Sequence, residues 1–487
     1  MLLKNLIKKI SKDKKNINIS GLSTNSKEVK KNFIFFAIKG NKLNGEKFIK
    51  EAINKGALVI ICSKNCKYKN KDVLIIRSKN IRFFLSEIAS RFYRMKPKNI
   101  IAVTGTNGKT SVADIFYQIL RVNNIPAASI GTLGIKYNGK IIKTGLTSPD
   151  TITLHKNLSI LKKKRINNVI IESSSHGLDQ KRLHHINFKG AIFTNFSQDH
   201  LDYHKNMKAY LNAKLILFRQ ILKKGSTLIS DKEIKQFPLI KKIAKNKSLK
   251  LLDIDNEFTK IKNFYSKTSN DFKIKNLSMA VKALKLCGLK KKLIYHSIKK
   301  IKDVNGRLEL VRKFSKDVKV FIDYAHTPDA LLKTLKSLRF NHKNNISLVF
   351  GCGGERDIKK RPLMAKIAHE NSDKIYITDD NPRNENPKKI RNSIIKGCKK
   401  LAIDIGSRKK AIESAIKELR SNEILLVSGK GHEETQNYGS KIINFSDKKL
   451  IKKIVRKKKF YNKRDNYPHF LLKKVFDNNS SKIINYD

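Results

Sequence analysis

The stretch that decides the fold is Asn99-Ile-Ile-Ala-Val-Thr-Gly-Thr-Asn-Gly-Lys-Thr110. Its run of four apolar residues predicts a buried strand over residues 99–104. Beyond the loop, apolar residues at 112, 115, 116, 119 and 120 recur at the spacing of one helix face. A glycine-containing loop between a strand and a helix lets backbone N–H groups turn toward phosphate, and the amino end of the helix adds positive potential. The sequence therefore predicts a phosphate-binding loop here.

The loop also carries the side chains that phosphate chemistry needs. Lys109 can reach the outer phosphates of a nucleotide, and the hydroxyl of Thr110 can ligate Mg²⁺. The general pattern G-x-x-x-x-G-K-[ST] is matched imperfectly, because Val103 stands where its first glycine would fall. The alternative is a glycine-rich turn that carries a lysine by chance, which the flanking strand and helix disfavour.

Further strands are predicted along the chain, and amphipathic helices separate them. This alternation indicates an α/β protein with parallel sheets. Several strands run into polar loops with glycine or histidine, and ligands of open α/β sheets bind just beyond the carboxyl ends of the strands. The first ninety-odd residues end in a helix, and Pro97 marks a domain junction. The later predicted strands are 169–172, 191–196, 318–324, 346–351, 374–380 and 423–429.

The charge balance is unusual, because 106 Lys and Arg oppose only 40 Asp and Glu, for a net charge of +66. Such an excess is typical of proteins that bind nucleic acid or acidic membranes. Here the excess is spread along the whole chain and is mostly lysine, and the abundance of Lys, Ile and Asn is what A/T-rich codons produce. We therefore favour compositional drift and expect no specific nucleic-acid partner. A basic nucleic-acid-binding ATPase stays open as the rival from another class.

Cysteine usage and hydropathy indicate a cytoplasmic globular protein. The five cysteines are scattered and odd in number, which points to a reducing compartment without a disulfide framework. No apolar run approaches the ~18 residues needed to span a membrane. The amino-terminal stretch MLLKNLIKKISKDKK is too interrupted by lysine for a signal peptide.

Beyond these local patterns, the chain resembles the Mur ligases, and among them the UDP-N-acetylmuramoyl-tripeptide synthetases. GTNGKT is the form of phosphate loop that Mur ligases share with folylpolyglutamate synthases. Eight further motifs follow in order, and the resemblance runs from about residue 20 to about residue 455. They are ESSSHGLDQKRL (172–183), TNFSQDHLDYH (194–204), YLNAKLILF (210–218), GRLE (306–309), DYAHTPDAL (323–331), GCGGERDIKKRPLM (351–364), DNPRNENP (380–387) and GKGHE (429–433).

This resemblance implies an α/β protein of three domains. They are a UDP-substrate-binding domain (1–98), a central P-loop ATPase domain with a parallel sheet (99–307) and a carboxy-terminal Rossmann-like domain that receives the amino acid (308–455). A basic tail of unknown role follows (456–487). The implied enzyme is a cytoplasmic monomer that uses ATP and Mg²⁺. ATP phosphorylates the terminal carboxylate of UDP-MurNAc-L-Ala-D-Glu, and the amine of a diamino acid then attacks the acyl phosphate.

The resemblance also implies where the two nucleotides bind. The ATP site would comprise Gly105, Thr106, Asn107, Gly108, Lys109, Thr110, Ser111, Asn276, Arg307 and Asp323, with His326 beside them. The UDP-substrate site would comprise Thr24, Ser26, Asn41, Thr147, Ser148, Ser174, Gln180 and Arg182. From the residues alone, Asp323 could equally be a helix cap before a helix that starts at His326-Thr-Pro.

The implied Mg²⁺ ligands are Thr110, Glu172, His200 and Lys214, and the implied catalytic residues are Lys109, Lys214 and His200. Glu172 ends a buried-looking strand, where a bare carboxylate is costly unless it meets a cation. Without the resemblance, His200 would be a structural hydrogen-bonder and Lys214 a solvated helix residue. The resemblance implies instead that Lys214 carries a CO₂-derived carbamate, which makes it a metal ligand.

The carboxy-terminal motifs bear on which amino acid is added. The implied diaminopimelate site comprises Arg356, Asp380, Asn381, Pro382, Arg383, Gly429 and Glu433. An arginine fork at position 383 suits the distal carboxylate that diaminopimelate has and lysine does not. A solvated turn arginine is the alternative. The sequence therefore favours meso-diaminopimelate over L-lysine and over a folylpolyglutamate synthase-like reaction.

Two regions depart from the family pattern. The segment from about 226 to 272 is short and rich in lysine and asparagine, so we expect a trimmed central sheet. The expected FN-x-x-N motif reads Phe272-Lys-Ile-Lys-Asn276, which keeps only the second asparagine and puts the adenine contacts in doubt.

Overall fold

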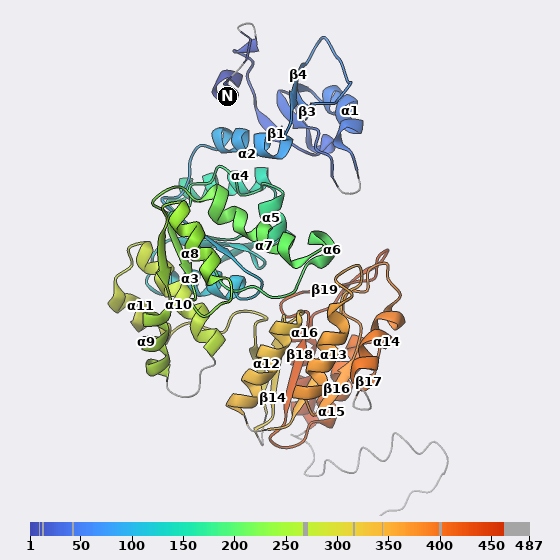
Figure 1. Cartoon of the computed structure of the whole chain (residues 1–487). Coiled ribbons are helices and arrows are strands. Elements are labelled where there is room, and N and C mark those ends of the chain that lie inside the picture. The colour runs from blue at the N-terminus through green and yellow to red at the C-terminus, as the bar shows by residue number, and fades with distance from the viewer. Residues whose placement is uncertain are drawn as a thin grey trace, which may run out of the picture. The chain divides into compact units, whose positions relative to one another are not determined.

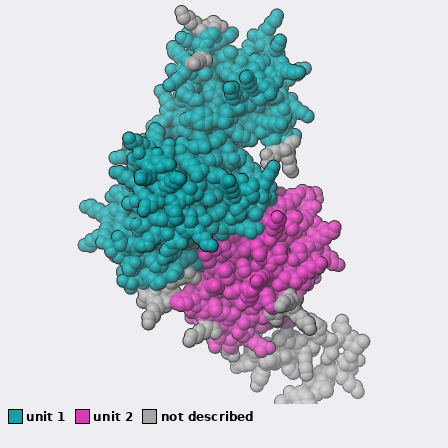
Figure 2. Space-filling view, viewed as in Figure 1, with its two compact units in different colours: residues 1–304 teal, residues 305–487 magenta. Residues whose placement is uncertain are grey.

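The computed structural model describes residues 1–461 except 9, 12–13, 41–42, 266–270, 315–316, 343 and 399–401 (Figure 1). The chain separates into two compact units, Met1–Val304 and Asn305–Asp487 (Figure 2). Of the residues predicted from the sequence, Asn41 and most of the tail lie outside the described residues.

The first unit begins with a small parallel sheet. Its elements are η1 (Leu3–Asn5), β1 (Gly21–Ser23), η3 (Ser26–Glu28), β2 (Phe33–Phe36), η4 (Gly45–Phe48), α1 (Ile49–Asn54), β3 (Ala57–Ser63), β4 (Leu74–Ser78) and α2 (Ile81–Phe92). The strands pair in the order β1-β2-β3-β4. Ile34 and Ile61 pack on the side of α2, whereas Phe35 and Ile60 pack on the side of α1. Successive strand residues point to opposite faces, so both faces are covered.

A larger, mostly parallel sheet forms the middle of this unit. Its strands are β5 (Asn99–Thr104), β6 (Ala127–Gly131), β7 (Gly134–Tyr137), β8 (Lys140–Ile142), β9 (Asn168–Glu172), β10 (Gly190–Phe193), β11 (Thr227–Ser230) and β12 (Lys250–Asp253). They lie in the order β12-β11-β10-β5-β9-β6-β7-β8, and only β7 and β8 run antiparallel to their neighbours. The predicted strand 99–104 is confirmed as β5.

Helices cover both faces of this sheet (Figure 1). They are α3 (Lys109–Val122), α4 (Thr151–Lys163), α5 (Ser175–Asp179), α6 (Leu201–His204), α7 (Met207–Ile216), the π-helical turn η5 (Leu217–Ile221), α8 (Phe237–Asn246), α9 (Asp255–Tyr265), α10 (Asp271–Leu286) and α11 (Lys291–Ile298). Ile100 of β5 packs in a cluster with Leu154 of α4, whereas Ile101 packs in a cluster with Phe116 of α3. The five apolar positions predicted to share one face of α3 are all buried.

The segment that departs from the family pattern forms strands of the central sheet, although the sequence predicts that the sheet is trimmed here. Residues 226–272 supply the edge strands β11 and β12 and the helices α8 and α9. β11 pairs parallel with β10, and β12 pairs parallel with β11. The short, lysine-rich segment therefore still extends the central sheet.

The second unit contains a sheet with one antiparallel edge. Its elements are β13 (Glu309–Lys313), β14 (Lys319–Asp323), α12 (Pro328–Asn341), β15 (Ile346–Phe350), α13 (Lys360–Asn371), β16 (Lys374–Ile377), α14 (Pro387–Cys398), β17 (Ala402–Asp404), α15 (Arg408–Glu418), β18 (Ile424–Ser428), β19 (Thr435–Asn437), β20 (Ile442–Asn444) and α16 (Asp447–Tyr461). The order is β13-β14-β18-β15-β16-β17, with β13 antiparallel to β14. β18 therefore lies between β14 and β15, although it follows them in sequence. The fold is α/β, as predicted.

In each unit the register brings the loops that carry the motifs to one edge. In the first unit, Val103 pairs with Glu172 and Thr104 pairs with Phe193, so loops 105–108, 173–174 and 194–200 leave adjacent strand ends. In the second unit, Asp323 pairs with Ser428. The predicted strand 374–380 stops at 377, because the residues that follow turn out of the sheet. No helix within the described part of the chain is long and apolar enough to cross a membrane.

Candidate active site

The loop between β5 and α3 has the backbone of a phosphate cradle. Gly105 has φ +140° and Gly108 has φ +86°, both in the region that side chains rarely adopt. A Cβ at either position would clash, at Gly105 with Thr194 Oγ1 and at Gly108 with Asn276 Oδ1. Glycine is therefore required here both by conformation and by space. The same contact places Asn276, the asparagine kept from the family motif, directly against the loop.

Lys109 begins α3 and folds back over the loop. Its Nζ donates to the carbonyl oxygens of Gly105 at 2.8 Å and Thr106 at 2.7 Å. The loop is braced from the neighbouring strand end, since Asn107 N donates to Asn195 Oδ1 at 2.9 Å. Lys109 thus presents its charge at the loop where the sequence places the phosphates.

Glu172, at the carboxyl end of β9, is buried with its carboxylate fully engaged. Thr110 Oγ1 donates to Oε2 at 2.9 Å, and Thr132 donates from its backbone N to Oε1 at 2.9 Å and from Oγ1 to Oε2 at 3.1 Å. The structure therefore brings together two of the predicted Mg²⁺ ligands, Thr110 and Glu172. Hydroxyl and carboxylate oxygens are the donors that Mg²⁺ prefers, so this pair fits the ion.

Lys214 lies in α7 and is only 1% exposed. Its Nζ donates to Gly105 O at 2.7 Å and lies 4.3 Å from the centre of the Tyr210 ring. Burial, and then the nearby Lys109, hold the pKa of Lys214 well below its usual value. The alternative of a solvated helix lysine is therefore wrong, because Lys214 is buried. A buried amine beside the phosphate loop fits a carbamate, which forms on the neutral amine and would add carboxylate oxygens.

His200 stands just before α6 in the left-handed conformation, with φ 55°. Its Nε2 lies 3.3 Å from Asp199 Oδ2, and its ring contacts those of His176 and Tyr210. Burial lowers the pKa of His200, and Asp199 only partly opposes this. A neutral imidazole is the form that can ligate a metal.

The predicted substrate residues of the central sheet form one hydrogen-bonded group. Ser148 Oγ donates to Glu172 O at 2.8 Å and accepts from Ser174 N at 2.9 Å. Arg182 donates from Nη1 to Ser148 O at 2.7 Å and from Nη2 to Gln180 Oε1 at 2.6 Å. The group links the backbone of Glu172, a predicted Mg²⁺ ligand, to four of the residues that the resemblance assigns to the UDP-substrate site. Thr147 borders it through Thr132, with their hydroxyl oxygens 3.1 Å apart.

Two of the predicted UDP residues, Thr24 and Ser26, directly follow strand β1 of the small sheet. Ser26 is buried and donates from Oγ to Glu51 Oε2 at 2.8 Å, whereas Thr24 is exposed. Asn41 lies outside the described residues. The structure therefore places Thr24 and Ser26 next to each other after β1, with Ser26 hydrogen-bonded to Glu51.

Arg307, Asp323 and His326 belong to the second unit. Asp323 is buried at the end of β14, and both the backbone N–H of Leu308 and the Thr334 hydroxyl donate to it. Burial raises the pKa of Asp323, and Arg307 partly opposes this. The alternative that Asp323 caps a helix is wrong, because Thr327 caps α12, which begins at Pro328.

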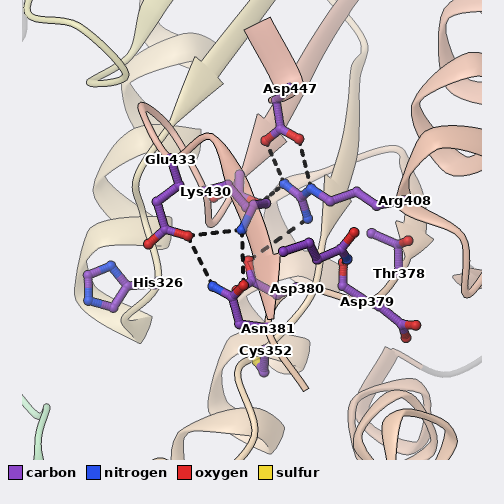
Figure 3. A network of polar contacts seen from close by, with 12 residues as sticks. His326, Cys352, Thr378, Asp379, Asp380, Asn381, Arg408, Lys430, Glu433 and Asp447 are labelled. Carbon is purple, nitrogen blue, oxygen red and sulfur yellow. Dashed lines mark hydrogen bonds and ion pairs between the residues drawn. The ribbon is translucent and has the colours of Figure 1, made fainter. Parts of the chain in front are cut away.

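Three of the residues predicted to bind diaminopimelate, Asp380, Asn381 and Glu433, lie close together in the second unit (Figure 3). Asn381 Nδ2 donates to Glu433 Oε2 at 3.0 Å, and the buried Lys430 donates to the same oxygen at 2.9 Å and to Asn381 Oδ1 at 3.2 Å. Burial raises the pKa of Glu433, but Lys430, Asn381 and His432 together outweigh burial and leave that pKa lowered. The loops 380–383 and 429–433 therefore form one polar site.

Arginine side chains lie on the loop before α13 and on the 380–383 loop. Arg383 is half-buried, has φ 55°, and donates from Nη1 to Gly354 O at 2.7 Å. Burial, and then the charge of Arg356, lower the pKa of Arg383. Arg356 itself is exposed. Arg383 thus lies near Arg356 and near the carboxylates of Asp380 and Glu433, so the loop offers charges of both signs.

Sequence reasoning missed several residues of these sites. Tyr210 could have been found, because it precedes Lys214 by four positions and shares its helix face. Thr132 gave no signal, since its role depends on the approach of β6 to β9. Arg408, which lies near Asp380, and its ion-pair partner Asp447 gave no sequence signal either (Figure 3).

Comparison with known proteins agrees with this layout. The family model "Mur ligase family, catalytic domain" matches residues 18–93, "Mur ligase middle domain" matches 103–290, and "Mur ligase, glutamate ligase domain" matches 306–431. A Rickettsia bellii protein named UDP-N-acetylmuramoyl-L-alanyl-D-glutamate–2,6-diaminopimelate ligase is 41% identical over 461 residues, which cover 88% of this chain and 94% of the relative. A Rickettsia montanensis protein of the same name is 39% identical over 469 residues, with coverage of 90% and 96%.

Solved structures give the same result. One of a protein with that name is 26% identical, with a TM-score of 0.65 and coverage of 94% of this chain and 99% of its own. A bifunctional folylpolyglutamate synthase/dihydrofolate synthase from Yersinia pestis, complexed with AMPPNP and a Mn ion, is 16% identical with a TM-score of 0.59. It covers 73% of this chain and 92% of its own, and at that identity it shares the fold alone.

Proposed function

Because the chain belongs to the Mur ligase family, whose members are ATP-dependent ligases that form amide bonds, we propose that it adds meso-diaminopimelate to UDP-MurNAc-L-Ala-D-Glu in peptidoglycan precursor synthesis. The proposal assigns the UDP-substrate to residues 1–98, ATP to 99–307 and the amino acid to 308–455. We further propose a cytoplasmic monomer. The role of the tail after 455 is not part of the proposal.

The observation that carries the amino-acid assignment is the pairing of the two loops in the second unit. Asn381, Lys430 and Glu433 bond one another at 2.9 to 3.2 Å, with Asp380 and Arg383 on the same loop as Asn381. An amino acid with a second ammonium and a second carboxylate has a partner for each charge here. L-lysine lacks the second carboxylate and would leave the arginine without that partner.

Phosphoryl transfer to the dipeptide carboxylate is assigned to the first unit. Mg²⁺, held by Thr110, Glu172, His200 and the carbamate of Lys214, would neutralise the charge that gathers on the phosphates. Lys109 would direct its ammonium at the outer phosphates, and the Gly105–Gly108 backbone would donate to them. Ser174, Gln180 and Arg182 would orient the dipeptide so that its terminal carboxylate faces the nucleotide. The products of this step are ADP and an acyl phosphate.

Amide formation follows when the amine of diaminopimelate attacks the acyl carbonyl carbon. The new C–N bond forms, the C–O bond to phosphate breaks, and the nitrogen loses a proton. The chain contributes by position: the loops at 380–383 and 429–433 hold the distal end of the amino acid and leave its reacting amine free. ADP, phosphate and the tripeptide product leave the enzyme.

The test is ATP-dependent phosphate release with UDP-MurNAc-L-Ala-D-Glu, tried separately with meso-diaminopimelate and L-lysine, and with folate plus glutamate as the alternative substrates. We expect release only with meso-diaminopimelate. Equal turnover with L-lysine would contradict the proposed preference for meso-diaminopimelate. Turnover with folate and glutamate would contradict the proposed reaction as a whole. A salt titration of binding to random duplex DNA addresses the rival class, because real phosphate binding weakens steeply with salt.

A further inference from the structure

Arg408 is an arginine in an unusual place. It is the first residue of α15, where the helix dipole disfavours a positive charge, and it is only 1% exposed. Arginine is rarely buried unless it is paired. Both facts indicate that a specific partner holds this side chain.

The partner is Asp447, the first residue of α16. Asp447 is also fully buried. Arg408 donates from Nε to Asp447 Oδ1 and from Nη2 to Oδ2, each at 2.8 Å. The same Nη2 donates to the carbonyl oxygen of Ser428 at 2.9 Å. Ser428 ends β18 and directly precedes the 429–433 loop, so the pair is fixed to one half of the amino-acid site.

The remaining nitrogen of the guanidinium, Nη1, faces the 380–383 loop of the proposed amino-acid site. Arg408 Nη1 lies 4.0 Å from Asp380 Oδ2, and both are buried atoms without a hydrogen bond (Figure 3). Gly429 packs closely against the same oxygen, because a Cβ there would lie 2.6 Å from Asp380 Oδ2. Arg408 therefore contacts one loop of the site and attracts the other without bonding to it.

This geometry sets the direction of the Asp380 carboxylate. Its Oδ2 is fully buried, whereas the side chain as a whole is 12% exposed. The two oxygens of a carboxylate are rigidly related, so holding Oδ2 toward Arg408 fixes where Oδ1 points. Loss of the positive charge behind Oδ2 would let the carboxylate rotate.

We propose that Arg408, held by Asp447, is a positioning residue that orients Asp380 toward the incoming diamino acid and ties the 380–383 loop to the 429–433 loop. This inference rests on the proposed function, because it names Asp380 as a contact of the amino acid. Arg408 touches neither the substrate nor the reacting atoms. Its contribution is to hold the Asp380 carboxylate in one direction by electrostatic attraction across 4.0 Å.

The test separates positioning from stability by removing the buried pair in two ways. Arg408→Met alone leaves Asp447 buried and unpaired, which should lower Tm strongly. Arg408→Met with Asp447→Leu removes both charges and should recover most of that Tm, because an apolar pair can replace a buried ion pair. Arg408→Lys keeps one charge but cannot span both partners. Arg339→Met, which breaks a half-exposed ion pair of the same unit, is the control.

The double variant should raise KM for meso-diaminopimelate about 10- to 100-fold, the cost expected of a misplaced binding group. KM for ATP and for UDP-MurNAc-L-Ala-D-Glu should stay within about twofold of the wild-type values. The KM of Arg408→Lys for meso-diaminopimelate should fall between those of the wild type and the double variant. A stable double variant with wild-type KM for meso-diaminopimelate would overturn the inference, as would an equal rise in all three KM values. A wild-type enzyme that does not use meso-diaminopimelate overturns the proposed function first, and the inference with it.

Discussion

Lys109 and Lys214 donate to the same atom, the carbonyl oxygen of Gly105, at 2.8 Å and 2.7 Å. Two ammonium groups on one oxygen repel each other strongly in a buried place. The repulsion is relieved if the more buried partner, Lys214, gives up its proton, which agrees with its lowered pKa. A neutral amine can add to CO₂, and the resulting carbamate would turn the repulsion between the two side chains into attraction.

Replacement of Lys214 tests this relationship. Lys214→Ala should lose activity by about 10²-fold or more, as for other electrostatic groups of active sites. Formate or acetate at high concentration should partly restore it by supplying the missing carboxylate. Lys208→Ala, at an exposed position of the same helix, should behave as wild type. Full activity of Lys214→Arg would contradict the carbamate, since a guanidinium would then serve as a plain cation.

Replacement of Lys109 tests the phosphate loop. Lys109→Ala should reduce kcat by roughly 10²-fold or more, because it removes a charge directed at phosphate. Its fold and Tm should change little, since the hydrogen bonds from its Nζ to Gly105 and Thr106 stay within one short loop. Arg121→Ala, near the far end of the same helix, is the matched control. A soluble, folded Lys109→Ala enzyme with near-normal kcat would rule out the assignment.

Arg383→Ala should change the choice of amino acid rather than the rest of the reaction. Losing one partner of a buried charged pair costs on the order of 2–5 kcal/mol, or roughly 30- to several-thousand-fold. We expect that loss in kcat/KM for meso-diaminopimelate, with little change for L-lysine. Affinities for ATP and UDP-MurNAc-L-Ala-D-Glu should be unchanged. If the wild-type enzyme uses both amino acids equally well, Arg383 does not determine specificity.

Acid should destabilise the first unit through two buried histidines. His155 is fully buried with neither ring nitrogen hydrogen-bonded, and burial lowers its pKa to about 3. Burial also lowers the pKa of His184 to about 4. The unfolded chain takes up these protons near pH 6.5, before the folded chain does, so stability is complete above that pH and falls as the pH drops below it.

Calorimetric Tm values between about pH 7 and pH 5 measure this effect. His155→Leu should flatten the decline, whereas His296→Ala, at an exposed position of α11, should leave its slope unchanged. A His155→Leu protein that loses stability with falling pH as steeply as wild type would show that this histidine titrates normally in the folded state.

Much of the fold follows from local pattern. Strand β5 and the buried face of α3 were predicted residue by residue, because apolar periodicity reports burial directly. The end of β16 was predicted three residues too late, at 380 instead of 377. The polar residues that follow Ile377 leave the sheet and lead into the 380–383 loop, and the apolar periodicity does not indicate that turn.

The candidate site divides in the same way. The phosphate loop could be derived from chemistry, since glycine, lysine and threonine each have a necessary use at that spacing. Lys214 could not, because nothing local distinguishes it among so many lysines, and only the resemblance pointed to it. Arg408 and Asp447 escaped both approaches, since they are 39 residues apart and meet only when α15 and α16 are in place.

The position of β18 has a consequence for how the protein is made. A ribosome delivers the strands of the second unit in sequence order, yet β18 is the last of that six-stranded sheet to be synthesised and belongs between β14 and β15. Until it emerges, the nascent chain holds two sheet fragments, β13–β14 and β15–β16–β17, each with an unpaired edge. Open strand edges are sites of mispairing and aggregation. The second unit therefore completes its fold late in translation, and chains that stop before residue 424 would be prone to aggregation rather than partly active.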